Sequence, residues 1–218
     1  MFSVLRSLGL KLFSLRSLIV LSVCLYYFVG MQVSTLEDIE PSFLTLYKIT
    51  FIGGILGLFL LFFAMHHRPI VSRLSTSGGI WMSALWLSLI AITQQPSLIF
   101  MLLIVLTFYD KDYKKMTGYL FVWLSLLFVV AAVLASLGVI NSGEILKYNL
   151  LVDSSEYEPV TALGMGNPNT AMSFLLGIVM SGAYIFYDSK YKNKYGILML
   201  IVSLVVYSMV GSRTGLIC

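Results

Sequence analysis

One arginine stands out because of its surroundings. Arg213 follows an apolar run and lies inside the segment Tyr-Ser-Met-Val-Gly-Ser-Arg-Thr-Gly at residues 207–215. A charged side chain at the edge of an apolar run is costly unless it binds a partner, and a guanidinium presents a planar pair of donors suited to phosphate. The flanking glycines would let a backbone turn approach a ligand closely. Arg213 is therefore either a phosphate-binding residue or an interfacial arginine that snorkels toward water.

A second polar cluster opens an earlier apolar run and reads Gly-Asn-Pro-Asn-Thr-Ala at residues 166–171. Asparagine is a favoured helix N-cap, and proline is favoured at the first helical position. Because the residue before a proline avoids helical geometry, Asn167 and Pro168 predict a helix that begins at Pro168. Asn167 and Asn169, beside a helix N-terminus, could also bind sugar hydroxyls or phosphate oxygens. Both interpretations remain open.

The other reactive side chains do not point to a metal or a nucleotide site. His66 and His67 are adjacent, so they face different sides of a helix and would not share a metal ion. The acidic residues Asp153, Glu156 and Glu158 could include a general base, but such a cluster is typical of a solvated loop. No P-loop, G-x-G-x-x-G or H-E-x-x-H motif occurs. We therefore expect no metal and no cofactor.

The composition places these residues in a membrane protein. Hydrophobic residues make up 59% of the 218 residues and charged residues only 11%, against about 25% charged in ordinary soluble domains. Several apolar runs approach the roughly 20 residues needed to cross a hydrocarbon core. The net charge of +4 would suit nucleic acid, but the basic residues form short clusters between apolar runs. That arrangement favours membrane orientation over nucleic-acid binding.

The fold class that follows is all-α, a single polytopic domain over residues 1–218 with about seven transmembrane helices. The predicted spans are residues 17–33, 49–65, 78–92, 96–108, 117–140, 168–187 and 196–210. The third and fourth are short and could form a tilted hairpin or a re-entrant pair. In the second, Gly53, Gly54 and Gly57 predict a face for close helix packing. Residues 1–16 suit an interfacial helix, with a signal peptide as the weaker alternative.

Charged residues predict the orientation of these spans. If the spans alternate, eleven of the 14 basic residues fall on one side of the membrane: Arg6, Lys11, Arg16, Arg68, Arg73, Lys111, Lys114, Lys115, Lys190, Lys192 and Lys194. Seven of the ten acidic residues fall on the other: Glu37, Asp38, Glu40, Glu144, Asp153, Glu156 and Glu158. The positive-inside rule then places the N-terminus in the cytoplasm and the loop of residues 141–167 outside. The chain stops at Cys218, three residues into a new apolar run, and we expect it to be truncated.

Together the two motifs resemble the O-antigen polymerase and O-antigen ligase family. The matching residues are Leu-Gly-Met-Gly-Asn-Pro-Asn-Thr-Ala at 163–171 and Tyr-Ser through Gly-Ser-Arg-Thr-Gly-Leu at 207–216. The pairing is much more specific than either motif alone. The resemblance covers the topology of essentially the whole chain, and its motifs lie in residues 160–217. The spacing and the small outer loops look closest to capsule or exopolysaccharide repeat-unit polymerases.

The resemblance implies a lipid-linked glycosyltransferase in the bacterial cytoplasmic membrane. Such enzymes move a growing glycan from undecaprenyl diphosphate to a second carrier-linked repeat unit on the outer face. The resemblance implies that Arg213 is catalytic and contacts the diphosphate, and we assign Asn167, Asn169, Ser212 and Thr214 to substrate binding. The expected partners are undecaprenyl-diphosphate-linked oligosaccharide, membrane lipid, and flippase and chain-length regulator proteins.

One departure and two alternatives accompany this resemblance. Family members continue through further spans and a large outer loop with more catalytic basic residues, so we expect this chain to be inactive as a polymerase on its own. An O-antigen ligase would share the fold and chemistry but use another acceptor. A polysaccharide or lipid transporter or flippase is also open, because interrupted helices build transporter sites. Against it, no predicted span has a charged residue near its middle and no half of the chain is repeated.

Overall fold

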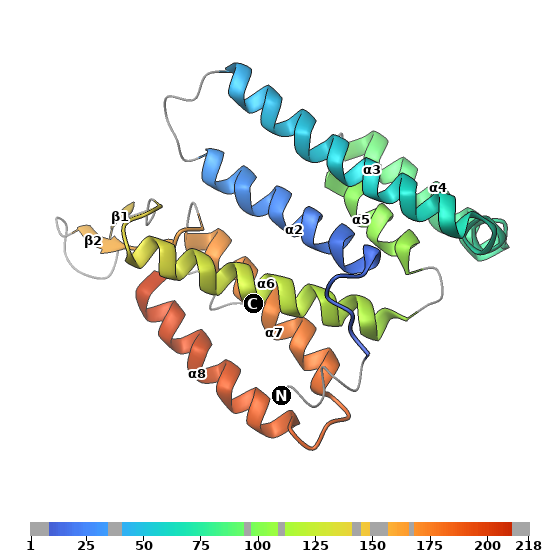
Figure 1. Ribbon diagram of the computed structural model, residues 1–218. Helices are drawn as coiled ribbons and strands as arrows, with labels where there is room; N and C mark the ends of the chain where they lie inside the picture. The colour runs from blue at the N-terminus through green and yellow to red at the C-terminus, as the bar shows by residue number, and fades with distance from the viewer. Residues whose placement is uncertain are drawn as a thin grey trace.

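The computed structural model describes residues 9–34, 41–93, 97–108, 112–140, 145–148, 157–165 and 168–210. The helices are α2 (Leu15–Ser34), α3 (Pro41–Leu74), α4 (Ser77–Thr93), α5 (Ser97–Thr107), α6 (Tyr113–Ser136), α7 (Pro168–Phe186) and α8 (Lys192–Val210). Two short strands, β1 (Ile145–Tyr148) and β2 (Tyr157–Val160), lie between α6 and α7. Figure 1 shows α6 running between α2 on one side and α7 on the other, with α8 outside α7 and α3 outside α2.

The helical membrane architecture expected from the composition is confirmed. Each predicted span coincides largely with one helix. In the described part of the chain, four helical segments are long and apolar enough to cross a membrane: Thr45–Leu74 of α3, and α6, α7 and α8. Within the described residues, Leu15–Gly30 of α2 and Leu98–Thr107 of α5 are apolar but shorter. The chain is thus a multi-pass membrane protein with a small β-hairpin that the sequence did not predict.

One predicted helix end is wrong. The span predicted for residues 117–140 ends earlier, at Ser136, because the chain turns through Gly138 with a φ of 69°. The N–H groups of Leu137 and Gly138 donate to the carbonyls of Val133 and Ala135, which closes the last helical turn. Glycine reaches this left-handed conformation without steric cost, so residues 137–140 form a turn.

At the histidine pair, next to the predicted span end at residue 65, α3 bends and then continues to Leu74. His66 has non-helical angles (φ −129°, ψ 21°) and Pro69 lies inside the helix. Proline has no N–H to donate to the carbonyl four residues earlier, which is that of Met65. The Nδ1 atom of His66 lies 3.1 Å from the carbonyl oxygen of Phe62. The span end predicted at residue 65 therefore coincides with a proline kink inside α3.

The core lies on both sides of α6. One cluster joins α6, α7 and α8 through buried side chains that include Phe121, Phe128, Phe174 and Ile178. A second joins α2, α3, α5 and α6 through Val20, Val23, Ile55, Phe100, Ile104 and Leu127. Because α6 contributes to both clusters, it is the central helix of the bundle.

The glycines of α3 are not where the helices pack. A Cβ atom added at Gly53, Gly54 or Gly57 would meet nothing within 4 Å. The buried positions of α3 are instead Ile55, Phe62 and Ile70, which repeat at helical spacing on one face. The close-packing face predicted from these glycines therefore does not contact any described part of the chain.

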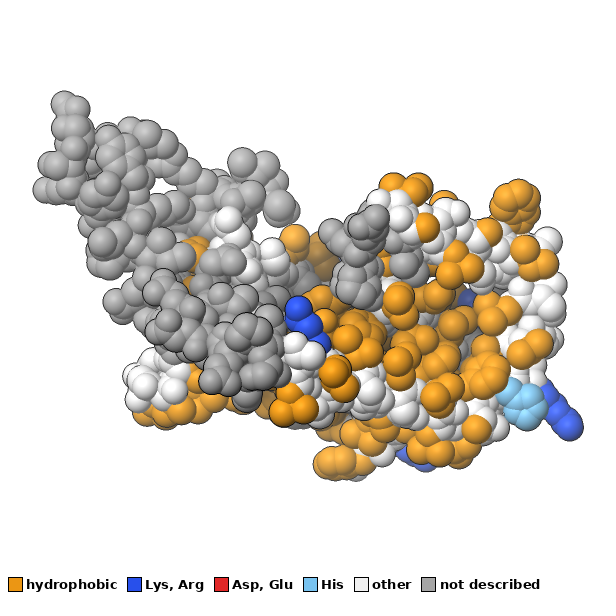
Figure 2. Space-filling model, turned by 90° about the horizontal axis from the view of Figure 1, so that it is seen from above, with side chains coloured by type: hydrophobic (Ala, Val, Ile, Leu, Met, Phe, Trp, Pro, Cys, Tyr) orange, Lys and Arg blue, Asp and Glu red, His pale blue; other side chains and the backbone are white. Residues whose placement is uncertain are grey.

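A broad apolar surface covers the outside of the bundle. Leu60, Met65 and Trp81 are 63%, 66% and 76% exposed, and many other large apolar side chains of α3, α4 and α8 are exposed as well. Figure 2 shows apolar side chains over most of the described part of one face. Water would oppose so large an apolar surface, whereas lipid tails would not. This exterior supports a membrane location independently of helix length.

The clusters of basic residues meet at one end of the bundle. The start of α6 is tied there to the end of α3 by a hydrogen bond from Arg73 to Tyr113. It is also tied to the end of α7 by a 3.4 Å ion pair between Lys114 and Asp188. Arg16, at the start of α2, lies 5.5 Å from the ring centroid of Phe108 at the same end. The β-hairpin, the start of α7 and the end of α8 lie at the other end (Figure 1).

Candidate functional site

A β-hairpin occupies the loop that the sequence placed outside the membrane. Strands β1 and β2 pair antiparallel, with Ile145 opposite Val160 and Tyr148 opposite Tyr157. Lys147 pairs in register with Glu158, which is one of the three acidic residues considered as a general base. The other two, Asp153 and Glu156, lie outside the described residues. The hairpin delivers the chain from β2 directly into the segment before the first motif.

A backbone hydrogen bond joins that segment to the last turn of α8. The N–H of Thr161 donates to the carbonyl oxygen of Met209 at 3.3 Å. Thr161 lies five positions before Gly166 of the first motif, and Met209 two positions before Gly211 of the second. The chain segments that lead into the two motifs are therefore adjacent in the fold, although they are distant in the sequence.

Buried apolar side chains hold both segments in place. Ala162, Met165 and Val210 are fully buried, and both Met165 and Val210 belong to the cluster that joins α6, α7 and α8. The Met165 N–H donates to the carbonyl of Ala162 at 2.8 Å, which forms a tight turn. The entrances to both motifs are consequently packed against the same core.

This turn requires a glycine where it crosses α6. Leu163 and Gly164 have φ values of 51° and 74°, a left-handed conformation that glycine adopts most readily. A Cβ atom at Gly164 would lie 2.9 Å from the carbonyl oxygen of Ala131 and 2.7 Å from Cδ1 of Ile140. Gly164 thus allows the turn both to adopt its conformation and to contact α6. Only the structure assigns these two roles to it.

The start of α7 at Pro168 confirms the predicted helix boundary. Asn169 lies in the first turn with an exposed side chain, and its carbonyl oxygen accepts a hydrogen bond from the Ser173 hydroxyl at 2.9 Å. The positive end of the α7 dipole lies at this turn. Asn169 is therefore exposed at the hairpin end of the bundle.

The remaining predicted site residues lie outside the described part of the chain. They are Asn167, Ser212, Arg213 and Thr214. Their described neighbours Pro168 and Val210 are the first residue of α7 and the last of α8. Both of these helix ends are at the hairpin end of the bundle (Figure 1).

The histidine pair contacts its own helix. The ring of His66 stacks on Phe62 with 4.5 Å between centroids, and the Nδ1 atom of His67 lies 3.3 Å from the carbonyl oxygen of Ala64. Among the described residues, no group of three or more His, Cys, Asp or Glu side chains could hold a metal ion.

The chemistry of the hairpin end thus rests on an exposed amide side chain, a helix N-terminus, and two motif entrances anchored to one core. Hydrogen-bond donors at such a place suit an anionic or polyhydroxylated ligand. Comparisons of the chain with protein-family models, with curated proteins and with solved structures find no match.

Proposed function

We propose that this chain is part of a membrane glycosyltransferase that polymerises undecaprenyl-diphosphate-linked oligosaccharide repeat units into surface polysaccharide, and that it is inactive as a polymerase on its own. The observation that supports the proposal is the hydrogen bond between Thr161 and Met209. It brings together the segments that lead into the two motifs, and a single site built from both motifs requires that proximity. The resemblance of these motifs to the O-antigen polymerase and ligase family supplies the chemistry.

In the proposed reaction, a hydroxyl of the acceptor repeat unit attacks the anomeric carbon of the donor glycan. The hydroxyl oxygen bonds to that carbon and its proton passes to water, and the bond between the carbon and the diphosphate oxygen breaks. Undecaprenyl diphosphate leaves with the additional negative charge. Arg213 stabilises this charge through paired hydrogen bonds, since the guanidinium stays protonated and matches a phosphate edge.

Asn169 is proposed to orient the sugar. It is exposed in the first turn of α7, where its side-chain amide offers both donors and an acceptor to sugar hydroxyls. Asn167, Ser212 and Thr214 are proposed to add further polar contacts to the saccharide or the diphosphate. All five proposed site residues belong to the two motifs or adjoin them in the sequence.

The proposed orientation puts this end of the bundle outside the cytoplasmic membrane and the N-terminus in the cytoplasm. The meeting of Arg73, Lys114 and the start of α2 at the opposite end supports it, because basic residues are retained on the cytoplasmic side. On the outer face no nucleotide sugar is present, so a lipid diphosphate is a suitable leaving group.

Deletion of the gene in its native host tests the activity. We expect loss of long polysaccharide and accumulation of single repeat units on the lipid carrier, exposed on the outer face, with recovery when the intact locus is restored. Carrier-linked polymer of normal length that fails to reach its final acceptor would indicate a ligase. Repeat units retained on the cytoplasmic side would indicate a flippase, and either result would overturn the proposed polymerisation.

A further inference from the structure

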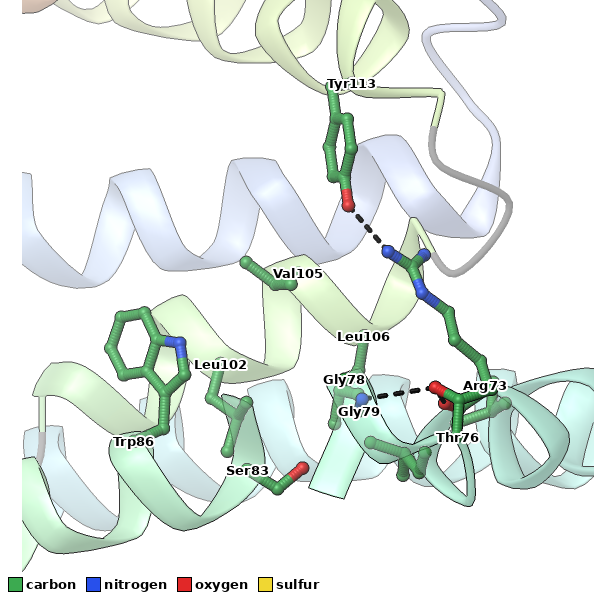
Figure 3. Close-up of a pocket in the computed structure, with 12 residues that line it drawn as sticks. Arg73, Thr76, Gly78, Gly79, Ser83, Trp86, Leu102, Val105, Leu106 and Tyr113 are labelled. Carbon is green, nitrogen blue, oxygen red and sulfur yellow. Dashed lines mark hydrogen bonds between the residues drawn. The ribbon is translucent and has the colours of Figure 1, made fainter. Parts of the chain in front are cut away.

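A cavity of about 410 Å³ lies at the end of the bundle that carries the basic residues. It is bounded by α3, α4, α5 and the first residue of α6, as Figure 3 shows. Its lining residues are Ile70, Arg73, Leu74, Thr76, Gly78, Gly79, Ser83, Trp86, Leu102, Val105, Leu106 and Tyr113. Among the described residues that line the cavity, Arg73 is the one charged residue. The size is that of a ligand pocket.

The cation at this cavity is held in a defined orientation. Arg73 donates from Nη1 to the carbonyl oxygen of Phe108 at 3.0 Å and from Nη2 to the Tyr113 hydroxyl at 2.6 Å. The guanidinium carbon also lies 5.9 Å from the Tyr113 ring centroid. Because the Tyr113 oxygen accepts from Arg73, the hydroxyl hydrogen is available to donate elsewhere. The pair can therefore present a positive charge and an O–H donor to one anion.

The start of α4 also contributes to the cavity. The Thr76 hydroxyl donates to the carbonyl of Arg73 and accepts from the N–H of Gly79, which caps the helix N-terminus. A Cβ atom at Gly79 would meet the carbonyl oxygen of Arg73, so glycine allows α4 to start directly against the end of α3. Gly78 and Gly79 consequently bring the positive end of a helix dipole to the cavity wall.

The rest of the cavity is apolar. Leu102, Val105 and Leu106 of α5 form one wall, and Figure 3 shows Trp86 at the end of the cavity away from Arg73. A small anion from water would leave this wall without a partner, whereas a lipid chain would cover it. The cavity is thus polar at one end and apolar along the rest, which matches an amphiphile with an anionic head.

We propose that this cavity binds one anionic membrane phospholipid. Its phosphate lies at Arg73 and Tyr113, and an acyl chain runs past Leu106 and Leu102 toward Trp86. A zwitterionic lipid fits less well because its ammonium group would lie near the guanidinium. Basic pockets between membrane helices on the cytoplasmic side are suited to anionic lipid heads. The site is at the opposite end from the proposed glycan site, so neither proposal depends on the other.

Fluorescence of Trp86 tests the proposal directly. The chain has three tryptophans, so Trp81→Phe with Trp123→Phe leaves Trp86 as the one reporter. The full chain is reconstituted in two sets of phosphatidylcholine vesicles. One set contains a small fraction of phosphatidylglycerol with brominated acyl chains, and the other contains the same fraction of phosphatidylcholine with brominated acyl chains. We expect the brominated phosphatidylglycerol to quench Trp86 with an apparent affinity about tenfold higher than the brominated phosphatidylcholine, as a charge-assisted hydrogen-bonded pair would produce.

Two variants distinguish lipid binding at this cavity from attraction to the general surface charge. Arg73→Gln should abolish the preference for phosphatidylglycerol, and Tyr113→Phe, which keeps the ring against Arg73, should reduce it. Arg68→Gln is the matched control, because Arg68 is an exposed arginine of the same helix that does not line the cavity. It should keep most of the preference, losing only the nonspecific attraction that added salt also weakens.

Three results would overturn the proposal. The first is equal quenching by the two brominated lipids in the parent protein. The second is an equal loss of the preference for phosphatidylglycerol in Arg68→Gln and Tyr113→Phe, which would show that the preference comes from surface electrostatics alone. This comparison does not depend on whether Arg73→Gln folds. The third is full competition by millimolar inorganic phosphate, which would assign the cavity to a soluble phosphate compound.

Discussion

Tyr195 of α8 packs directly against Gly182 of α7. The Tyr195 hydroxyl donates to the carbonyl oxygen of Ile178 at 3.0 Å and lies 3.2 Å from that of Val179. A Cβ atom at Gly182 would overlap the Tyr195 hydroxyl and ring. A small residue thus admits a tyrosine that bonds back to the neighbouring helix, as is common between membrane helices.

We predict that Gly182→Ala separates α7 from α8 and destabilises the protein. The methyl group has no space beside Tyr195, and overpacking of this kind costs about 1–3 kcal/mol. Thermal unfolding in detergent should show a lower midpoint. Gly57→Ala, at a glycine with open space, is the control and should be neutral or slightly stabilising because alanine favours helix.

The same contact predicts coupling between the two positions. Tyr195→Ala removes the ring that blocks the methyl group, so Gly182→Ala should cost much less on a Tyr195→Ala background than alone. Additive effects of the two substitutions on the unfolding midpoint would contradict the proposed steric cause.

A buried hydrogen bond predicts a second stability effect, between α2 and α6. Trp123 donates its indole N–H to the Ser17 hydroxyl at 3.0 Å, and Ser17 is fully buried. Ser17→Ala leaves the indole N–H without this acceptor and should cost about 0.5–2 kcal/mol. Ser208→Ala is the control, since that exposed hydroxyl bonds to its own helix at Val205. Equal unfolding midpoints for the two variants would argue against a role for the Trp123 bond.

Orientation in the membrane can be tested by labelling. In a chain with Cys24→Ala and Cys218→Ala, Ser155→Cys should react with an impermeant maleimide added to intact cells. Lys192→Cys, at the exposed first residue of α8, should react only after lysis. The expectation follows from the split of basic residues. Protection of position 155 until lysis would refute the predicted orientation.

The proposed role of Arg213 predicts a strict requirement for a guanidinium. At the native locus, Arg213→Ala should reduce polymer formation by about two to three orders of magnitude, equivalent to about 3–4 kcal/mol of transition-state stabilisation. Arg213→Lys keeps the charge but lacks the planar pair of donors, so it should be severely impaired. Both comparisons require equal protein levels in the membrane. If Arg213 snorkels at the interface, polymer length should be normal in both variants.

The sequence by itself was sufficient for the membrane class and for the approximate position of each helix. Helix position depends on local hydrophobicity, and within a membrane the backbone must satisfy its own hydrogen bonds, which favours helices. The Asn167–Pro168 pair also predicted where α7 begins, because the conformational restriction of proline acts within a few residues. These features required no knowledge of distant contacts.

Only the tertiary structure decided which faces of the helices meet. Gly53, Gly54 and Gly57 were the predicted packing face, yet they face open space, while Gly164 and Gly182 lie at close contacts. An apolar membrane helix is similar on all sides, and lipid tails are as apolar as leucine, so hydrophobicity does not mark the buried face.

The sequence alone could not predict two of the hydrogen bonds, the one from Thr161 to Met209 and the one from Arg73 to Tyr113. Each joins segments that are brought together by the packing of several helices, and no local pattern encodes that proximity. The residue types that suit phosphate and sugar could be found in the sequence. Which of them lie near one another depends on long-range packing, which is where the free energy of helix association resides.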